Sequence, residues 1–179
     1  MSRSLIGVLL LALALRIGAA IACEGHAFSA DEAHWQRMAE AVWRHGLLST
    51  EAGFFRPPLY PLLIACVYGV LGYEPLFVRL LQAVLSAATC LMPYGLARTA
   101  YGERAGLYAA LLAACHPLFI FFSGLFMAET LLLACTGLAL WQVQRVVDRP
   151  NASRAAGLGA ILGLGALCKP VLLIWVPLL

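Results

Sequence analysis

Two polar stretches interrupt the apolar amino-terminal part of the chain. Asp31 follows the first hydrophobic segment, and the basic, proline-stiffened sequence Arg56-Pro57-Pro58 comes shortly afterwards. A carboxylate can accept a proton from a hydroxyl group, and an arginine can bind a phosphate through paired hydrogen bonds. An acid and a base placed where the chain leaves an apolar segment suggest chemistry on a phosphate carried by a lipid.

The composition is that of a multi-pass membrane protein. Of the 179 residues, 63% are hydrophobic and 12% are charged, about half the charged share of soluble domains. The net charge of +3 is dispersed along the chain, so we expect no nucleic-acid partner. The six cysteines and the histidines of the first loop lack metal-ligand spacing, so we predict no metal and no cofactor.

The apolar segments predict an all-α, polytopic membrane fold. They cover 4–22, 57–72, 76–97, 105–128, 130–144 and 155–179. A helix needs about 20 residues to cross a bilayer, whereas the segment 57–72 is shorter and begins with two prolines. If it lies in the interface instead, the arginines between the other segments share one side, as the positive-inside rule requires. These arginines are Arg3, Arg98, Arg104, Arg145, Arg149 and Arg154.

We therefore expect one amino-terminal transmembrane module, 1–179. Residues 1–22 form the first span, 23–75 form an extracytoplasmic loop with amphipathic juxtamembrane helices, and 76–179 form further spans. The alternative for 1–22 is a cleaved signal peptide, whose apolar region Arg16 would interrupt. Pro117 should kink the third span, and Lys169-Pro170 should end the last helix.

The first loop contains a predicted helix with clear ends. Ser29 and Glu32 fit a capping box, and Gly46 is a plausible end. An apolar stripe at helical spacing is typical of a helix on a bilayer surface; it consists of Trp35, Met38, Ala39, Val42 and Trp43. Asp31 should project from this apolar face toward the bundle, whereas Glu32, Gln36, Glu40 and Arg44 should line the wet face.

Ionisable residues at membrane depth are costly and indicate function. The predicted topology brings six of them to the outer interface: Arg16, Asp31, Arg56, Arg79, Glu129 and Lys169. Each also has a simpler interpretation. The acids can stabilise helix N-termini, Arg56 can anchor an interfacial segment, and the other basic side chains can snorkel to lipid headgroups.

Several motifs, in order, resemble the amino-terminal module of GT-C membrane glycosyltransferases. After Asp31 come "RPPLYPLLIACVYGVLG", "RLLQAVLSAATCLMPYGLAR", "YGERAGLYAALLAACHPLFIFFSGLFMAET" and "GLGALCKP". The branch they resemble most includes the protein mannosyltransferase-like, aminoarabinose and galacturonosyl transferases. The resemblance covers essentially the whole chain and implies a GT-C helical bundle, of which this is the amino-terminal part.

The resemblance also implies a reaction and residue roles. Such enzymes transfer a sugar from a polyprenyl-phosphate donor outside the cytoplasmic membrane to a glycolipid, glycan or protein acceptor. Asp31 takes the position of the first-loop catalytic acid and Glu129 that of the second acid. Arg56 takes that of the donor phosphate-binding residue. Arg79 or Lys169 would assist it electrostatically, and Asp31 would act as the base in an inverting transfer.

The sequence departs from the family pattern at two places. His34-Trp35 replaces a tyrosine that is common after the acid. Phe55 stands where the aminoarabinose branch has a metal-associated glutamate. The second difference argues against a metal at that position and against an aminoarabinose donor.

Two other functions fit some of these features. One is a non-catalytic membrane module that binds a polyprenyl-phosphate carrier, and the other is a small transporter that uses Glu129 as a proton site. The transporter leaves the Asp31 helix and Arg56-Pro57-Pro58 unexplained. The sequence ends within an apolar run at Leu179, so we expect an incomplete fragment that is inactive by itself.

Overall fold

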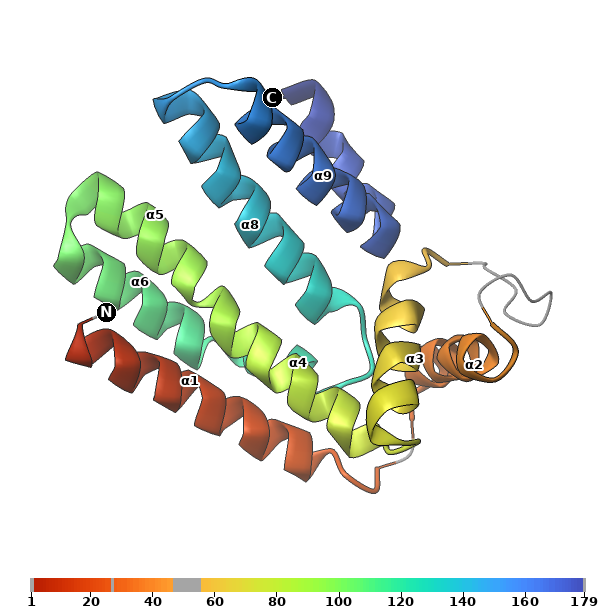
Figure 1. Cartoon of the computed structure of the whole chain (residues 1–179). Coiled ribbons are helices and arrows are strands. Elements are labelled where there is room, and N and C mark those ends of the chain that lie inside the picture. The colour runs from red at the N-terminus through yellow and green to blue at the C-terminus, as the bar shows by residue number, and fades with distance from the viewer. Residues whose placement is uncertain (1, 27, 47–55, 179) are drawn as a thin grey trace.

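The computed structural model describes residues 2–26, 28–46 and 56–178, and in these ranges it contains helices and no strand (Figure 1). The helices follow in the order α1 (Arg3–Ala22), α2 (Ala30–His45), α3 (Leu59–Leu71), α4 (Pro75–Thr89), α5 (Leu91–Tyr101), α6 (Glu103–Cys115), α7 (Pro117–Gly124), α8 (Glu129–Asp148), α9 (Ala152–Cys168) and the 3-10 helix η2 (Pro170–Leu178). The predicted all-α fold is confirmed.

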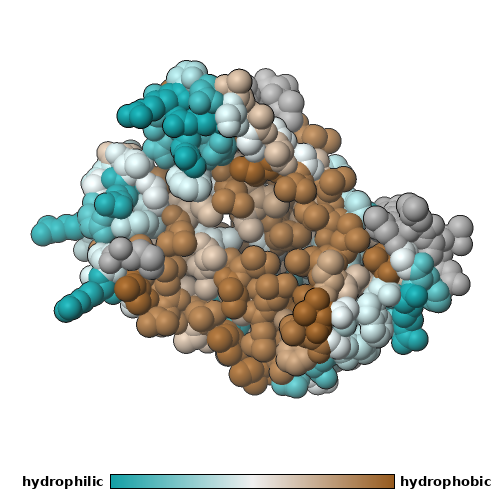
Figure 2. Space-filling model, viewed as in Figure 1, coloured by the Kyte–Doolittle hydropathy of each residue, from teal (hydrophilic) through white to brown (hydrophobic). Residues whose placement is uncertain are grey.

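Among the described residues, three helical stretches are long and apolar enough to cross a membrane: α1, α4 with α5 (Pro75–Tyr101), and α8. The pair α6 and α7 makes a fourth if its 49° bend lies within one span. Apolar side chains cover the middle of the visible face, with hydrophilic groups toward its edges (Figure 2). The chain is thus a multi-pass membrane protein. The last predicted apolar segment, 155–179, instead contains the end of the 17-residue helix α9 and the 3-10 helix η2, and α9 is shorter than the three spanning stretches.

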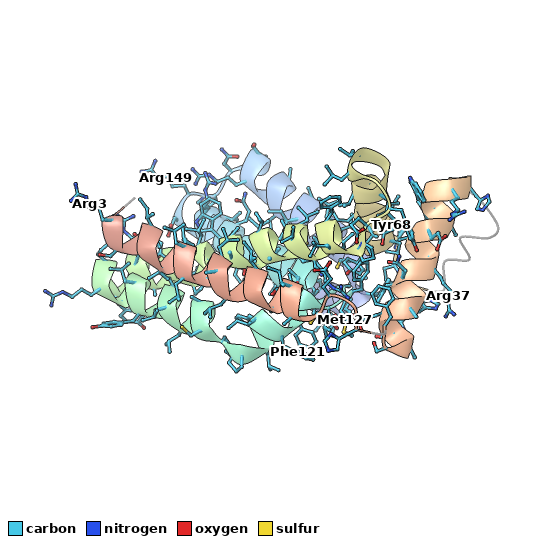
Figure 3. All side chains as sticks on the ribbon, turned by 90° about the horizontal axis from the view of Figure 1, so that it is seen from below. Arg3, Arg37, Tyr68, Phe121, Met127 and Arg149 are labelled. Atoms are coloured by element: carbon cyan, nitrogen blue, oxygen red, sulfur yellow. The ribbon has the colours of Figure 1, made fainter. Side chains whose placement is uncertain are left out.

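The two ends of the bundle differ in character. Helices α2 and α3 gather at the end where α1 finishes and α4 and α8 begin (Figure 1). Arg3 and Arg149 lie at the opposite end, far from Arg37 of α2 (Figure 3). Helix α3 has 13 residues, too few to cross a bilayer. The length of α3 fits an interfacial segment, and Arg3 and Arg149 share one end of the bundle; the side of the membrane on which they lie stays a prediction.

Helix α2 begins and ends as predicted. Ser29 Oγ accepts the N–H of Glu32 at 3.3 Å, and Glu32 Oε2 accepts the N–H of Ser29 at 3.0 Å, which completes the capping box. Gly46 ends the helix at φ +84°, a conformation that a glycine adopts without strain. The apolar stripe packs largely against α3 rather than facing lipid, because Trp35, Met38 and Ala39 are buried with residues of α3.

The wet face predicted for α2 is partly wrong. Glu32 and Gln36 are buried, with exposed fractions of 5% and 6%, whereas 43% of the Asp31 side chain is exposed. Gln36 lies between two tyrosine hydroxyls: Tyr68 donates to its Oε1 at 2.6 Å, and its Nε2 donates to Tyr73 at 3.0 Å. The buried face of α2 is wider than the apolar stripe because neighbouring segments offer hydrogen-bond partners to these polar groups.

The break between α6 and α7 leaves backbone carbonyls without their usual helical partners. In a continuous helix the Ala113 carbonyl would accept the N–H of residue 117, but Pro117 has none. Arg16 of α1 replaces it. Its Nη2 donates to the Ala113 carbonyl at 3.1 Å and its Nη1 to the Ala114 carbonyl at 2.9 Å. Its Nε donates to Ser86 of α4 at 2.7 Å, so one fully buried cation joins three helical segments at the predicted kink.

The expectation that Arg16 belongs to the outer charge cluster is therefore wrong. Its hydrogen-bond donors are directed to carbonyls at the kink inside the bundle, and its side chain is fully buried. A buried guanidinium needs acceptors, and the proline break supplies them without an acidic partner.

Buried polar side chains of α4 bind the carboxyl end of α7. Arg79 Nε donates to the Gly124 carbonyl at 3.0 Å, and Gln82 Nε2 donates to the Leu125 carbonyl at 2.6 Å. The final carbonyls of a helix lack intrahelical donors. Arg79 and Gln82 therefore fix the turn that leads from α7 into α8.

Replacing Arg16 should destabilise the bundle. In Arg16→Met the carbonyls of Ala113 and Ala114 lose their donors, at an expected cost of about 2–4 kcal/mol. Thermal unfolding in detergent, followed by circular dichroism, measures the change. Arg3→Met, the same substitution at an exposed helix end, is the control and should unfold as the wild type does. Equal unfolding temperatures of Arg16→Met and Arg3→Met would contradict the role assigned to Arg16.

Candidate functional site

Asp31 and Arg56 form an ion pair at the α2–α3 end of the bundle. Asp31 lies in the first turn of α2, and its Oδ1 accepts a hydrogen bond from Nη2 of Arg56. Arg56 precedes Pro57-Pro58, which lead into α3. The two side chains are 43% and 30% exposed, so the pair is open to solvent on one side. The sequence prediction that these residues lie together is consistent with this placement.

The face of Trp35 supports the Arg56 guanidinium. The central carbon of Arg56 lies 4.9 Å from the centre of the Trp35 ring, a cation–π distance. Trp35 is buried and meets Tyr60 edge-on with ring centres 5.3 Å apart. The Tyr60 hydroxyl donates to Gln82 Oε1 at 2.7 Å. Rigid aromatic groups on α2 and α3 thus hold Arg56 and connect it to α4.

A second ion pair joins Glu129 and Lys169. Glu129 begins α8, and its Oε1 accepts a hydrogen bond from the Lys169 Nζ at the end of α9. The neighbouring Cys168 Sγ donates to the Ala128 carbonyl at 3.6 Å, which also links the two ends. Helix α9 stops at Cys168 because Pro170 cannot continue it, as predicted. The break brings Lys169 to the start of α8.

The two ion pairs belong to the same end of the bundle. Trp35 and Tyr60, which lie beside Arg56, share one buried cluster with Ala128 and Cys168, the neighbours of the second pair. The positive charge of Lys169 also acts on Asp31. Two acids and two bases of the predicted site are therefore arranged around a common apolar cluster.

The pKa of Asp31 is lowered from its ordinary value of 3.8. The hydrogen bond from Arg56 is the main cause; partial burial opposes it, and the charges of Arg56, Lys169 and His34 reinforce it. Asp31 is therefore ionised at neutral pH. While Arg56 is bound to it, however, it is a weak base.

Glu32 has a role that its sequence position does not reveal. Besides closing the capping box, it accepts the N–H of Phe126 through Oε1 at 3.0 Å. Phe126 lies in the turn between α7 and α8, just before Glu129. This buried hydrogen bond fixes the helix that carries Asp31 to the turn that carries Glu129. The capping-box spacing identifies Glu32, but its tertiary partner cannot be found from local sequence.

Two buried polar atoms at this end have no hydrogen-bond partner within the described ranges: Nε2 of His34 and Oε2 of Glu129. Buried polar atoms are nearly always bonded. His34 lies one helical turn after Asp31 and acts on its charge. Both atoms are therefore candidates for contact with a substrate, and no sequence pattern identifies His34 as one.

Arg79 has a different environment from Arg56 and Lys169. It is only 4% exposed, its Nε is bound to the Gly124 carbonyl, and its guanidinium lies 5.5 Å from the Phe28 ring centre and 5.4 Å from that of Phe126. The described residues give it no ion pair. Its predicted role in donor binding stays a prediction, as does the interpretation of Phe55, which lies outside the described residues.

Comparison with known proteins identifies the family. The sequence profile of the dolichyl-phosphate-mannose-protein mannosyltransferase family matches residues 55–179. No curated protein and no solved structure matches the chain. The matched region includes Arg56, Glu129 and Lys169, while Asp31 precedes it. The chain belongs to the dolichyl-phosphate-mannose-protein mannosyltransferase family and is a GT-C type glycosyltransferase module.

Proposed function

We propose that the protein transfers a sugar, with inversion, from a polyprenyl-phosphate donor to an extracytoplasmic acceptor, which is a lipid, a glycan or a protein. The observation that carries this proposal is the pairing of Asp31 with Arg56 and of Glu129 with Lys169 around one apolar cluster. The reaction takes place at the outer face of the cytoplasmic membrane, at the end of the bundle opposite Arg3 and Arg149.

Arg56 and Lys169 are the proposed phosphate-binding residues. Arginine has five N–H donors, and only Nη2 of Arg56 is hydrogen-bonded within the described residues. Its other donors can bind the donor phosphate while Trp35 keeps the guanidinium in place. Lys169 contributes a second positive charge. Both charges stabilise the lipid phosphate as it leaves the anomeric carbon.

Asp31 is the proposed general base. It removes the proton from the acceptor hydroxyl, whose oxygen attacks the anomeric carbon from the face opposite the phosphate. The phosphate competes for Arg56, which weakens the hydrogen bond that keeps the pKa of Asp31 low. Donor binding therefore makes Asp31 a stronger base. Glu129, with its unpaired Oε2, orients the acceptor or shares the proton.

Asp31→Asn tests the base directly. The amide keeps the size of the side chain but cannot accept the proton, so transfer from a radiolabelled polyprenyl-phosphate hexose should fall at least about a hundredfold. Membranes containing the full-length protein provide the assay. Glu40→Gln is the matched control, because Glu40 is on the same helix and pairs with Arg44 on its outer side. Transfer that survives in Asp31→Asn would remove Asp31 from the mechanism.

The pH dependence of transfer tests the competition for Arg56. The acid limb of kcat/KM reports the free protein, and that of kcat reports the donor complex. Because Arg56 lowers the pKa of Asp31 more in the free protein than in the donor complex, the acid limb of kcat should lie at higher pH than that of kcat/KM. Coincident limbs would show that the phosphate does not weaken the Asp31–Arg56 pair.

The Glu129–Lys169 pair should contribute separately to folding and to transfer. Lys169→Met leaves a partly buried carboxylate unpaired and should lower the free energy of unfolding by about 1–3 kcal/mol. The double variant Glu129→Gln/Lys169→Met removes that unpaired charge, so its stability should recover while its transfer activity stays low. Thermal unfolding and the radiolabel assay measure the two effects. Recovery of transfer in the double variant would show that the pair is only structural.

A further inference from the structure

A polar pocket lies where α1 ends and α4 begins. Its volume is about 330 Å³, and its lining includes Glu24, His26, Glu74 and Arg79. These residues belong to the chain just after α1 and to the beginning of α4. None of them takes part in the Asp31–Arg56 or Glu129–Lys169 pair. The pocket is therefore distinct from the two ion pairs.

The charges of this pocket face a common space without pairing. Glu24 and Glu74 form no ion pair with Arg79, and within the described ranges neither carboxylate has a hydrogen-bond partner. Glu74 precedes α4, yet its side chain does not cap the helix. Opposite charges that line one pocket but remain unpaired can both be satisfied by a ligand carrying the complementary charges.

Arg79 provides the anchored positive charge of this pocket. Only 4% of Arg79 is exposed, and its Nε donates a hydrogen bond to the Gly124 carbonyl. The rings of Phe28 and Phe126 lie close to its guanidinium. No protein partner within the described residues engages its two terminal nitrogens, which lets them donate to a phosphate in paired geometry. A positioned guanidinium of this kind is suited to a phosphate.

We propose that this pocket binds the phosphoethanolamine headgroup of a membrane phospholipid. The phosphate meets Arg79, with His26 beside it, and the ammonium meets Glu24 and Glu74. A zwitterion suits a pocket of both signs, whereas a purely anionic headgroup or a prenyl phosphate would leave the two carboxylates without a cation. The position at the end of the first membrane-spanning helix is where phospholipid headgroups lie.

Lipid retention measured by native mass spectrometry tests the site. The full chain is released from nanodiscs containing equal amounts of dioleoyl-phosphatidylethanolamine and dioleoyl-phosphatidylglycerol. The wild type should retain the ethanolamine lipid preferentially. Glu24→Gln/Glu74→Gln should lower the ratio of ethanolamine to glycerol lipid about two- to fivefold, the range expected for partly exposed ion pairs. Asp148→Asn, an exposed acid on α8 outside this pocket, is the control and should leave the ratio unchanged.

Arg79→Gln should weaken retention of the ethanolamine lipid about tenfold. Arg79→Gln also removes the hydrogen bond to the Gly124 carbonyl and could disturb folding. Glu24→Gln/Glu74→Gln removes no such bond, so it tests the pocket without that complication. An unchanged lipid ratio in that variant, or no lipid preference in the wild type, would overturn the proposal. Displacement of the lipid by farnesyl phosphate or by soluble O-phosphoethanolamine at equal concentration would also overturn it. Sugar transfer is not measured, so either outcome is independent of the proposed glycosyltransferase reaction.

Discussion

The contact between Arg16 and the carbonyls at the α6–α7 break determines much of the remaining arrangement. Pro117 removes a helical donor, and without another donor the carbonyls of Ala113 and Ala114 would be buried unsatisfied in an apolar bundle. Arg16 supplies that donor and joins α1, α4 and α6 at the bend. The bend allows α7 to turn into α8, and the turn presents the Phe126 N–H to Glu32. The Glu32–Phe126 hydrogen bond in turn links the helix that carries Asp31 to the turn that precedes Glu129.

In the candidate site, as at Arg16, each charged side chain is satisfied by a partner of the opposite polarity, but these pairs are more exposed to solvent. Its acids and bases are paired, and aromatic rings or helix ends hold each base in position. Such pairs neutralise charge near the membrane and can exchange partners when a phosphate arrives. The lowered pKa of Asp31 belongs to the state in which it is paired with Arg56. Weak basicity in the free protein is therefore compatible with the proposed role.

Local sequence predicted much of the fold because its signals act over short distances. Ser29 and Glu32 define the start of α2, Gly46 its end, Pro117 the kink and Pro170 the end of α9. Hydrophobic segments long enough to span a membrane identified α1, the α4–α5 helix and α8. These features depend on backbone donors, backbone conformation and helix length, and each is encoded within a few residues or one apolar segment.

The remaining features depend on partners distant in sequence. Glu32 and Gln36 appeared solvent-facing because their buried partners, Phe126 and Tyr68, come from other elements. The sequence predicted that Arg16 belongs to the charge cluster at the outer interface, because no local pattern shows that α1 lies beside the carbonyls of Ala113 and Ala114. The pairings of Asp31 and Glu129 lie between these cases. Topology brought the charges to one end, but only the tertiary structure showed which acid meets which base.

The most direct measurement is equilibrium binding of a sugar-free polyprenyl phosphate to the full chain in detergent, by isothermal titration calorimetry. Arg56→Gln should weaken this binding about tenfold, because it removes the charged donors held against Trp35. Arg44→Gln, which removes an exposed arginine from the outer side of α2, should leave it unchanged. Equal affinity of the wild type and Arg56→Gln would contradict the assignment of this end of the bundle to the donor phosphate.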